Sequence, residues 1–347
     1  MAGCHDYEIS ADRREGLTME SIERTKEKTI TTVTLRIHRY DGKRKWQQDY
    51  RVKAMPGLTV LRALMQIKEE QDPTLAFTAS CRMGLCGACA VRVNGNAELA
   101  CDVPVAALIK RYESDTLTIE PLGNFRVIRD LVVDWEPKYA RLKKVKPALT
   151  QKSDVTVEEG SRQTPAEFNV YKKYAACILC GSCVSECNKN RLNQNDFLDP
   201  FAFVRAERLA ADSTSKSPEE HVKAVVASGL WRCFNCQECT AKCPKGLDPA
   251  GAIEKLRMAT FRYKLPDTVG SRHAKAIYDD IQESGTLDES KLNIKSEGFL
   301  MAGLRASMAL RLMRVGKMNP LDKHPVNPEI KTIDAVVKTA ERAGREE

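Results

Sequence analysis

The amino-acid sequence predicts an α+β protein in which a small sheet domain is followed by an all-helical domain. Residues 31–122 contain short segments in which apolar and polar side chains alternate, the period of a half-buried strand. After about residue 126 the apolar residues recur at helical spacing instead. Twelve of the thirteen cysteines fall into three groups, at residues 81–101, 177–187 and 233–243. The first group lies in the sheet part and the other two lie in the helical part, so we expect sites in both.

Composition limits the class of protein. The chain has 347 residues, 42% of them hydrophobic, which allows two or three domains with buried cores. Its net charge of +8 is spread among interleaved acidic and basic residues, a pattern that does not indicate nucleic-acid binding. No run of about eighteen apolar residues occurs, so we expect no membrane-spanning helix. The start, MAGCHDYEISADRREG, lacks the apolar core of a signal peptide, and with clustered cysteines this predicts a reducing, cytoplasmic setting.

The order of elements in the first part is informative. We expect, in chain order, strands at 32–40 and 47–55, a helix at 57–70, and strands at 88–94 and 116–122. The cysteine-containing loop falls between the helix and the third strand. This order fits a small β-grasp domain. Residues 128–149 then lead to the helical part, where 200–213 and 217–231 have helical patterning.

The first cysteine group has the spacing C-x4-C-x2-C-x11-C, formed by Cys81, Cys86, Cys89 and Cys101. Its first three members match plant-type ferredoxin ligation of a [2Fe-2S] cluster. Gly84 and Gly87 are expected to let the loop wrap the cluster closely, because a residue without Cβ can adopt positive φ. A structural zinc site is the alternative, although zinc sites usually pair two C-x2-C units.

The second and third groups repeat one spacing, C-x2-C-x2-C-x3-C. Their members are Cys177, Cys180, Cys183 and Cys187, then Cys233, Cys236, Cys239 and Cys243. In bacterial ferredoxins with this spacing, the fourth cysteine of each run ligates the cluster of the other run. Cys243 should therefore join the first three cysteines of the earlier run around one [4Fe-4S] cluster, and Cys187 should join the later run. Two zinc ribbons are the alternative.

Together with the flanking motifs CRMGLCGACAVRVNG, PLGNFRVIRDLVVD, CILCGSCVSEC and CPKGLDPAGAIEKLR, these cysteines resemble the iron–sulfur subunits of succinate dehydrogenase and fumarate reductase. The resemblance covers roughly residues 30–265. It implies an electron-transfer subunit that works with a flavoprotein (FAD) subunit and passes single electrons to or from a quinone or another acceptor. We find no G-x-G-x-x-G motif after a strand and no flavin motif, so we assign no catalytic residue and expect no catalysis by this chain alone.

Cys236 is the main departure from this resemblance. Most family members have an apolar residue there and hold a [3Fe-4S] cluster, whereas a fourth thiolate should complete a [4Fe-4S] cluster of lower potential. The alternative is that Cys236 is an unligated thiol and the third cluster is [3Fe-4S]. The quinone-reducing relatives also have Pro and Trp after the equivalent of Cys187, and His after the equivalent of Cys233. This chain has CNKNRLN and Phe234 at these places. The usual quinone pocket is therefore in doubt.

The C-terminal part resembles the small iron–sulfur subunit of heterodisulfide reductase, through RHA, GTLDE and LRLMRVGKM. That resemblance implies a partner with cysteine-rich CCG domains. Leu300, Leu304, Met308 and Leu312 recur every four residues on one helical face, accompanied by Arg305, Arg311 and Arg314. Such a face is usual for packing within the chain or against a partner, and a membrane-surface helix is the alternative. His273, in the RHA motif, is expected to be structural.

We therefore expect four segments: a flexible extension (1–30), a β-grasp [2Fe-2S] domain (31–125), a helical domain with two further clusters (126–265) and a helical partner-docking tail (266–347). The protein should be part of a hetero-oligomer with a flavoprotein and either a CCG-domain or a membrane-anchor acceptor subunit, peripheral on the inner face of the cell membrane. A related complex with a heterodisulfide- or glycolate-type flavoprotein substrate, and a non-redox assembly protein stapled by zinc, are the alternatives.

Overall fold

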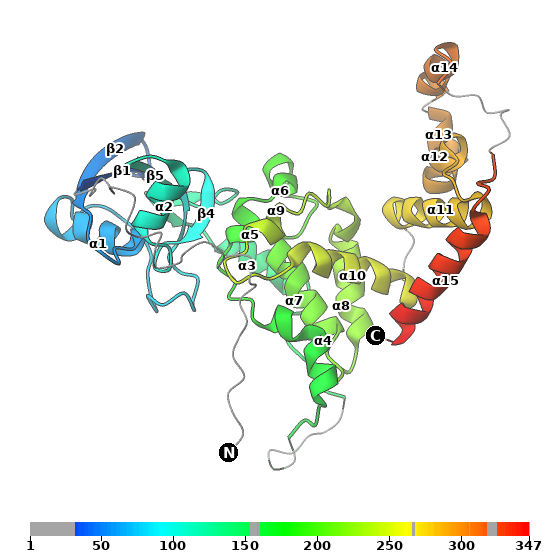
Figure 1. Ribbon diagram of the computed structural model, residues 1–347, viewed down its shortest axis with the longest axis horizontal. Helices are drawn as coiled ribbons and strands as arrows, with labels where there is room; N and C mark the ends of the chain where they lie inside the picture. Colours follow the sequence, from blue (N-terminus) through cyan, green and yellow to red (C-terminus); the bar gives the residue numbers. More distant parts are fainter. Residues whose placement is uncertain are drawn as a thin grey trace, which may run out of the picture.

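The computed structural model describes residues 32–152, 158, 160–265, 268–304, 306–317 and 325–346. A sheet domain, a helical domain and a helical tail follow one another along the chain and lie in that order across Figure 1. The predicted α+β class is thus confirmed. Among the described residues, no helix combines the length and the apolar character needed to cross a membrane. The predicted extension at 1–30, including Cys4, lies outside the described residues.

Five strands form the sheet, in the order β2-β1-β5-β3-β4. They are β1 (Thr32–Tyr40), β2 (Lys45–Lys53), β3 (Ala90–Val93), β4 (Asn96–Leu99) and β5 (Thr116–Glu120). β1 pairs parallel with β5 and antiparallel with β2, and β3 pairs antiparallel with β4 and β5. Val33, Leu35 and Ile37 of β1 are fully buried, because alternate residues of a strand face the same side.

Two helices accompany the sheet, α1 (Val60–Glu70) and α2 (Val105–Tyr112). The side chain of Thr59 accepts a hydrogen bond from the amide of Arg62 and caps α1, which therefore begins three residues later than predicted. α2 and β4 were not predicted. β4 is four residues long and has no β-branched or aromatic side chain, so its sequence carries little strand signal.

The junction between the domains is more ordered than the predicted bridge. β6 (Val127–Arg129) pairs with β7 (Val132–Val133), and α3 (Glu136–Lys143) follows. Trp135 and Phe125 make an edge-to-face contact with ring centroids 4.9 Å apart, and both pack against the cores of the two domains. These rings therefore tie the sheet domain to the helical domain.

The helical domain is built around three helices, α7 (Pro200–Ala210), α8 (Pro218–Ala227) and α10 (Pro249–Arg262). Its shorter elements are α4 (Pro165–Ala175), α5 (Ser182–Ser185), α6 (Asn188–Leu192), the 3-10 helix η3 (Leu230–Arg232) and α9 (Glu238–Ala241). Phe201 and Phe203 of α7 are buried in the core that these helices share. The helices predicted from residues 200 and 217 are confirmed.

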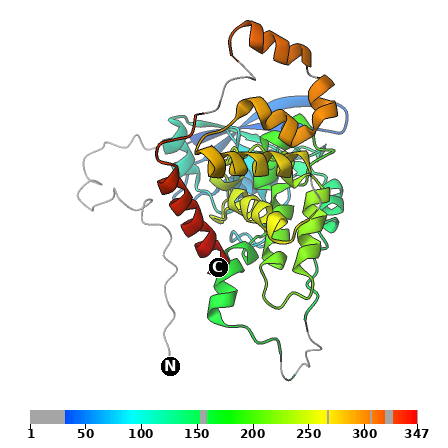
Figure 2. The ribbon, with the colours of Figure 1, turned by 90° about the vertical axis from the view of Figure 1, so that its right-hand side faces the viewer.

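The tail consists of α11 (Val269–Ser284), α12 (Glu289–Glu297), α13 (Phe299–Leu304), α14 (Ala306–Arg314) and α15 (Ile330–Glu346). α11 packs against α12 and α15. His273 of α11 lies 3.1 Å from Ser296 Oγ through its Nδ1, which agrees with a structural role. α13 and α14 extend away from α11 and from the helical domain (Figure 2).

Candidate metal centres

The first cysteine group is brought together by the β3–β4 hairpin. Cys89 directly precedes β3 and Cys101 follows β4, and the pairing of Ala90 with Leu99 sets the two cysteines side by side. The amide of Cys101 lies 3.4 Å from Cys89 Sγ. The eleven-residue gap in the sequence pattern is therefore the length of this hairpin.

Backbone amides surround the sulfur of Cys81. Met83, Leu85 and Cys86 donate to Cys81 Sγ at 3.5, 3.3 and 3.3 Å. These donors, Met83 foremost, lower the pKa of Cys81 to about 7. Cys89 differs, because burial raises the pKa of its thiol to about 12. The loop thus stabilises a thiolate at its exposed end and presents a buried thiol at the other.

Gly84 and Gly87 adopt the left-handed conformation, with φ of +71° and +74°. The amide of Gly84 donates to Cys101 Sγ at 3.2 Å. The positive φ that the sequence predicted at both glycines is thus observed, and their role in wrapping a cluster stays a prediction.

One pocket of the helical domain gathers three cysteines of the first run and one of the second. Cys177, Cys180, Cys183 and Cys243 all line it. The other lining residues are mostly apolar and include Phe201 of α7. The empty space, which includes some open solvent, is about 350 Å³.

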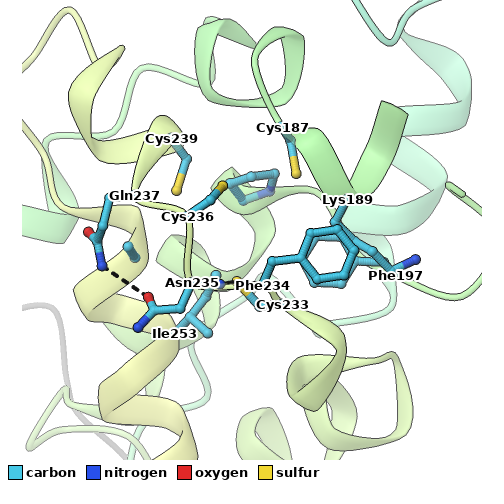
Figure 3. A pocket seen from close by; sticks show the side chains of 12 residues that line it. Cys187, Lys189, Phe197, Cys233, Phe234, Asn235, Cys236, Gln237, Cys239 and Ile253 are labelled. Carbon is cyan, nitrogen blue, oxygen red and sulfur yellow. Dashed lines mark hydrogen bonds between the residues drawn. The ribbon is translucent and has the colours of Figure 1, made fainter. Parts of the chain in front are cut away.

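The second pocket, shown in Figure 3, gathers the other four cysteines. Cys187, Cys233, Cys236 and Cys239 line a space of about 360 Å³, again partly open to solvent. The sulfurs of Cys187, Cys236 and Cys239 face the same region between their segments (Figure 3). Cys236 is exposed and Cys239 is buried, so the loop that carries Cys236 forms the outer wall.

The repeat in the sequence extends to backbone conformation. Leu179 and Gly181, on either side of Cys180, have φ of 53° and 81°. Asn235 and Gln237, on either side of Cys236, have φ of 54° and 63°. A four-residue helix, α5 or α9, follows in each case. Cys236 therefore occupies the position in its loop that Cys180 occupies in the other.

The donor set fits iron–sulfur clusters. In the part of the chain that the structure describes, no three Cys, His, Asp or Glu side chains close on one point as the ligands of a single ion do. The thiols stand around the walls of a hollow instead. Burial raises the pKa of Cys177 to about 11 and that of Cys239 to about 12, so metal binding has to displace protons from these thiols.

Known protein families match both parts of the chain. Residues 34–140 match the 2Fe-2S iron-sulfur cluster binding domain, and residues 146–247 match the 4Fe-4S dicluster domain. The chain is 50% identical over 290 residues to the 8-methylmenaquinol:fumarate reductase iron-sulfur subunit of Wolinella succinogenes, a match that covers 82% of this chain and 91% of that protein. The chain belongs to the iron–sulfur subunits of the succinate dehydrogenase and fumarate reductase family.

Other relatives of this iron–sulfur subunit agree. The fumarate reductase iron-sulfur subunit of Mycobacterium tuberculosis is 39% identical over 220 residues (63% of this chain, 87% of that protein), and a mitochondrial succinate dehydrogenase iron-sulfur subunit of Oryza sativa subsp. japonica is 37% identical over 235 residues (65% and 74%). A chain of the Mycobacterium smegmatis Sdh1 complex in the apo form superposes with a TM-score of 0.61 at 26% identity, covering 68% of this chain and 98% of that one.

The predicted electron-transfer role in an oxidoreductase complex, carrying [2Fe-2S] and [4Fe-4S] domains, is thus confirmed. Membership also implies that the chain is one subunit of a hetero-oligomer.

The iron–sulfur subunit also contains polar groups at these centres that the sequence did not reveal. Asn124 donates from Nδ2 to the carbonyls of Val184, Ser185 and Cys187 at 2.8, 3.1 and 3.0 Å, and so satisfies the end of α5. Asn188 lies beside the outer wall of the second pocket, within contact of Cys236. Both contacts join residues about fifty or sixty positions apart, which no local pattern signals.

Proposed function

We propose that the twelve grouped cysteines hold three clusters. The [2Fe-2S] cluster would take Cys81, Cys86, Cys89 and Cys101; a [4Fe-4S] cluster would take Cys177, Cys180, Cys183 and Cys243; and the third would take Cys187, Cys233, Cys236 and Cys239. The observation that carries the assignment is the lining of the two pockets, each of which combines cysteines of both runs. The equivalent backbone conformation around Cys180 and Cys236 supports a [4Fe-4S] rather than a [3Fe-4S] cluster at the third position.

The proposed role is to carry electrons one at a time between a flavoprotein and a quinone or a thiol/disulfide-type acceptor. Clusters of this kind supply one-electron redox chemistry when bound. Reduction of fumarate to succinate at the flavoprotein takes up two electrons and two protons, and oxidation of a quinol or a dithiol releases the same number; the reverse reaction has the same balance. The chain handles only the electrons, through the three centres that its cysteines would hold.

The W. succinogenes relative is named after both a quinol and fumarate. This name supports a quinone, rather than a thiol/disulfide compound, as the second redox partner. We therefore favour electron flow from a quinol towards fumarate. The absence of the usual Trp and His beside Cys187 and Cys233 supports a quinone site outside this chain, on the partner subunit. A flavoprotein with a heterodisulfide- or glycolate-type substrate is the second candidate.

The tail is the proposed docking surface for the acceptor subunit, of the CCG-domain or the membrane-anchor type. Phe299 and Leu300 are each 82% exposed and Leu304 is 73% exposed, so the described residues leave this apolar face uncovered. Arg311 and Arg314 add exposed positive charge at its far end. We place the complex on the inner face of the cell membrane, attached through these partners, and fractionation with and without them would test that location.

Visible and electron paramagnetic resonance (EPR) spectroscopy of anaerobically purified protein tests the proposal. Cluster binding predicts a brown protein whose broad visible absorption is bleached by dithionite, with separate EPR signals from reduced binuclear and cubane centres. A colourless protein that contains zinc would support the rival function, an assembly protein stapled by redox-silent ions.

A further inference from the structure

The loop of the first cysteine group touches a cysteine of the second. Gly87 is buried, and a Cβ added to it would lie 2.6 Å from Cys180 Cβ and 2.7 Å from Cys180 Cα. Real Cβ atoms essentially never approach other atoms so closely. Cys180 itself belongs to the hydrophobic core of the sheet domain. Only a glycine can fill this position at the observed spacing.

A second glycine makes a similar approach from the junction segment. A Cβ added to Gly123 would lie 2.8 Å from the carbonyl oxygen of Ser185. The amide of Gly123 also donates to Ser185 Oγ at 2.9 Å. Unlike Gly87, Gly123 does not have a positive φ, so its lack of a side chain serves the contact rather than a left-handed turn.

Both contacts converge on residues 180–185, a segment that carries Cys180 and Cys183. A longer side chain of the sheet domain binds the residue that follows this segment: Arg92 Nε donates to Glu186 Oε1 at 3.1 Å. Added bulk at either glycine should therefore force a local separation while such ties keep the domains associated. Electron transfer through protein slows steeply with distance, so this spacing bears directly on function.

We propose that Gly87 and Gly123 are positioning residues that set the distance between the first and second cysteine groups, and with it the rate of electron transfer between the centres they hold. This inference rests on the proposed function. The glycines act through the packing of the sheet domain on residues 180–185, and neither contributes a side chain to a centre.

The sheet domain offers a matched control. Gly57 has nearly the same φ as Gly87, +72°, but a Cβ there would meet no atom within 4 Å. Gly57→Ala thus imposes the strain of a positive φ without the clash against Cys180. Gly123→Ala imposes a clash without that strain, and Gly87→Ala imposes both.

The test uses the purified complex reduced with dithionite. A reduced cubane nearby speeds the spin relaxation of the reduced binuclear centre, so the microwave power that saturates its EPR signal reports their separation. We expect saturation at lower power in Gly87→Ala and Gly123→Ala, by up to severalfold, with unchanged iron content and signal positions. Gly57→Ala should saturate like the unmodified complex. Hydrogen–deuterium exchange at residues 180–185 should rise in the first two variants only.

The outcomes separate the inference from the proposed function. Missing iron in the unmodified complex would refute the proposed function itself. The role of the glycines alone would be overturned by a different result. In that case the Gly87→Ala and Gly123→Ala complexes would keep all their iron, and their saturating microwave power and hydrogen–deuterium exchange would equal those of the unmodified complex. If Gly87→Ala fails to retain its binuclear centre, Gly123→Ala decides the question by the same two measurements.

Discussion

Asn188 Nδ2 lies 3.7 Å from Cys236 Sγ, within the range of a weak hydrogen bond to sulfur. Asn188 directly follows Cys187, so one side chain links the end of the first cysteine run to the exposed loop of the second. Hydrogen bonds to ligand sulfurs are among the factors that set the potential of an iron–sulfur centre. If Cys236 is a ligand, as proposed, Asn188 should therefore help to set the potential of the third centre.

Cys236→Val tests that ligand. We expect loss of one iron and the appearance of the EPR signal of an oxidised [3Fe-4S] centre, with a higher potential, because the fourth thiolate is gone. Asn188→Ala is the control: it removes the hydrogen bond and keeps the thiol, so the [4Fe-4S] form should remain with an altered potential. A Cys236→Val spectrum identical to that of the unmodified protein would show that Cys236 is a spectator.

A reciprocal pair of substitutions tests the crossed assignment. Cys243→Ser should damage the centre held by Cys177, Cys180 and Cys183, because Cys243 lines their pocket although it lies in the later run. Cys187→Ser should damage the other centre, whose pocket it lines. EPR of the reduced variants distinguishes the two signals. If each substitution instead affects the centre of its own run, the crossed assignment is wrong.

Deletion of residues 299–318 should release the acceptor subunit, because it removes the exposed apolar face of α13 and α14. The flavoprotein should stay bound, because we expect it to attach through the sheet domain, which the deletion leaves intact. Co-purification with each partner is the measurement. Leu304→Glu should weaken the same association, whereas Val336→Glu, at a 64% exposed position of α15, should not. A truncated chain that keeps both partners would contradict a docking role for the tail.

Arg39 should be a main determinant of sheet-domain stability. It is 3% exposed and pairs with Asp130 at 3.0 Å and Asp72 at 2.5 Å. Arg39→Leu leaves these carboxylates without their partner and should lower the free energy of unfolding by about 3–5 kcal/mol. Arg36→Leu, three residues earlier, breaks only the exposed pair with Asp49 and should lower the free energy of unfolding far less, because solvent screens an exposed ion pair. Native-state hydrogen exchange of the β1 amides measures both; equal effects would refute this ranking.

Glu207 gives the helical domain a pH dependence. Burial raises the pKa of Glu207 to about 7, against the opposing influence of Lys255 and Arg262. A raised carboxyl pKa means that stability falls as pH rises from the unfolded-state pKa towards 7, and is level above it. The stability gained in Glu207→Gln should therefore grow between pH 5 and 7.5, by up to about 3 kcal/mol. Thermal unfolding across this range tests it; Glu220→Gln, at an exposed site, is the control, and a pH-independent difference would contradict the assignment.

The sequence predicted the features that depend on local patterns. The alternation of apolar and polar residues predicted β1, in which Val33, Leu35 and Ile37 are buried. The spacing of the cysteines predicted which thiols would line the same pocket. Both signals work because neighbouring residues share one geometry, a pleated strand or a tight loop. The division into four segments and the ligand roles of individual cysteines remain predictions.

Other features depend on partners distant in the chain. The need for glycine at position 87 against Cys180, and the binding of Asn124 to carbonyls of α5, appear only once the two domains are packed together. α2 had a signal in its apolar spacing after Pro104, but it is only eight residues long, and short apolar runs do not distinguish helix from strand.

Metal and acid-labile sulfide analysis of anaerobically purified protein tests the central claim most directly. One binuclear and two cubane centres predict about ten irons and about ten sulfides per chain, with no stoichiometric zinc. A count near nine irons, with a [3Fe-4S] signal, would remove only Cys236 from the ligands. Stoichiometric zinc with no sulfide would contradict the account of this chain as an electron carrier.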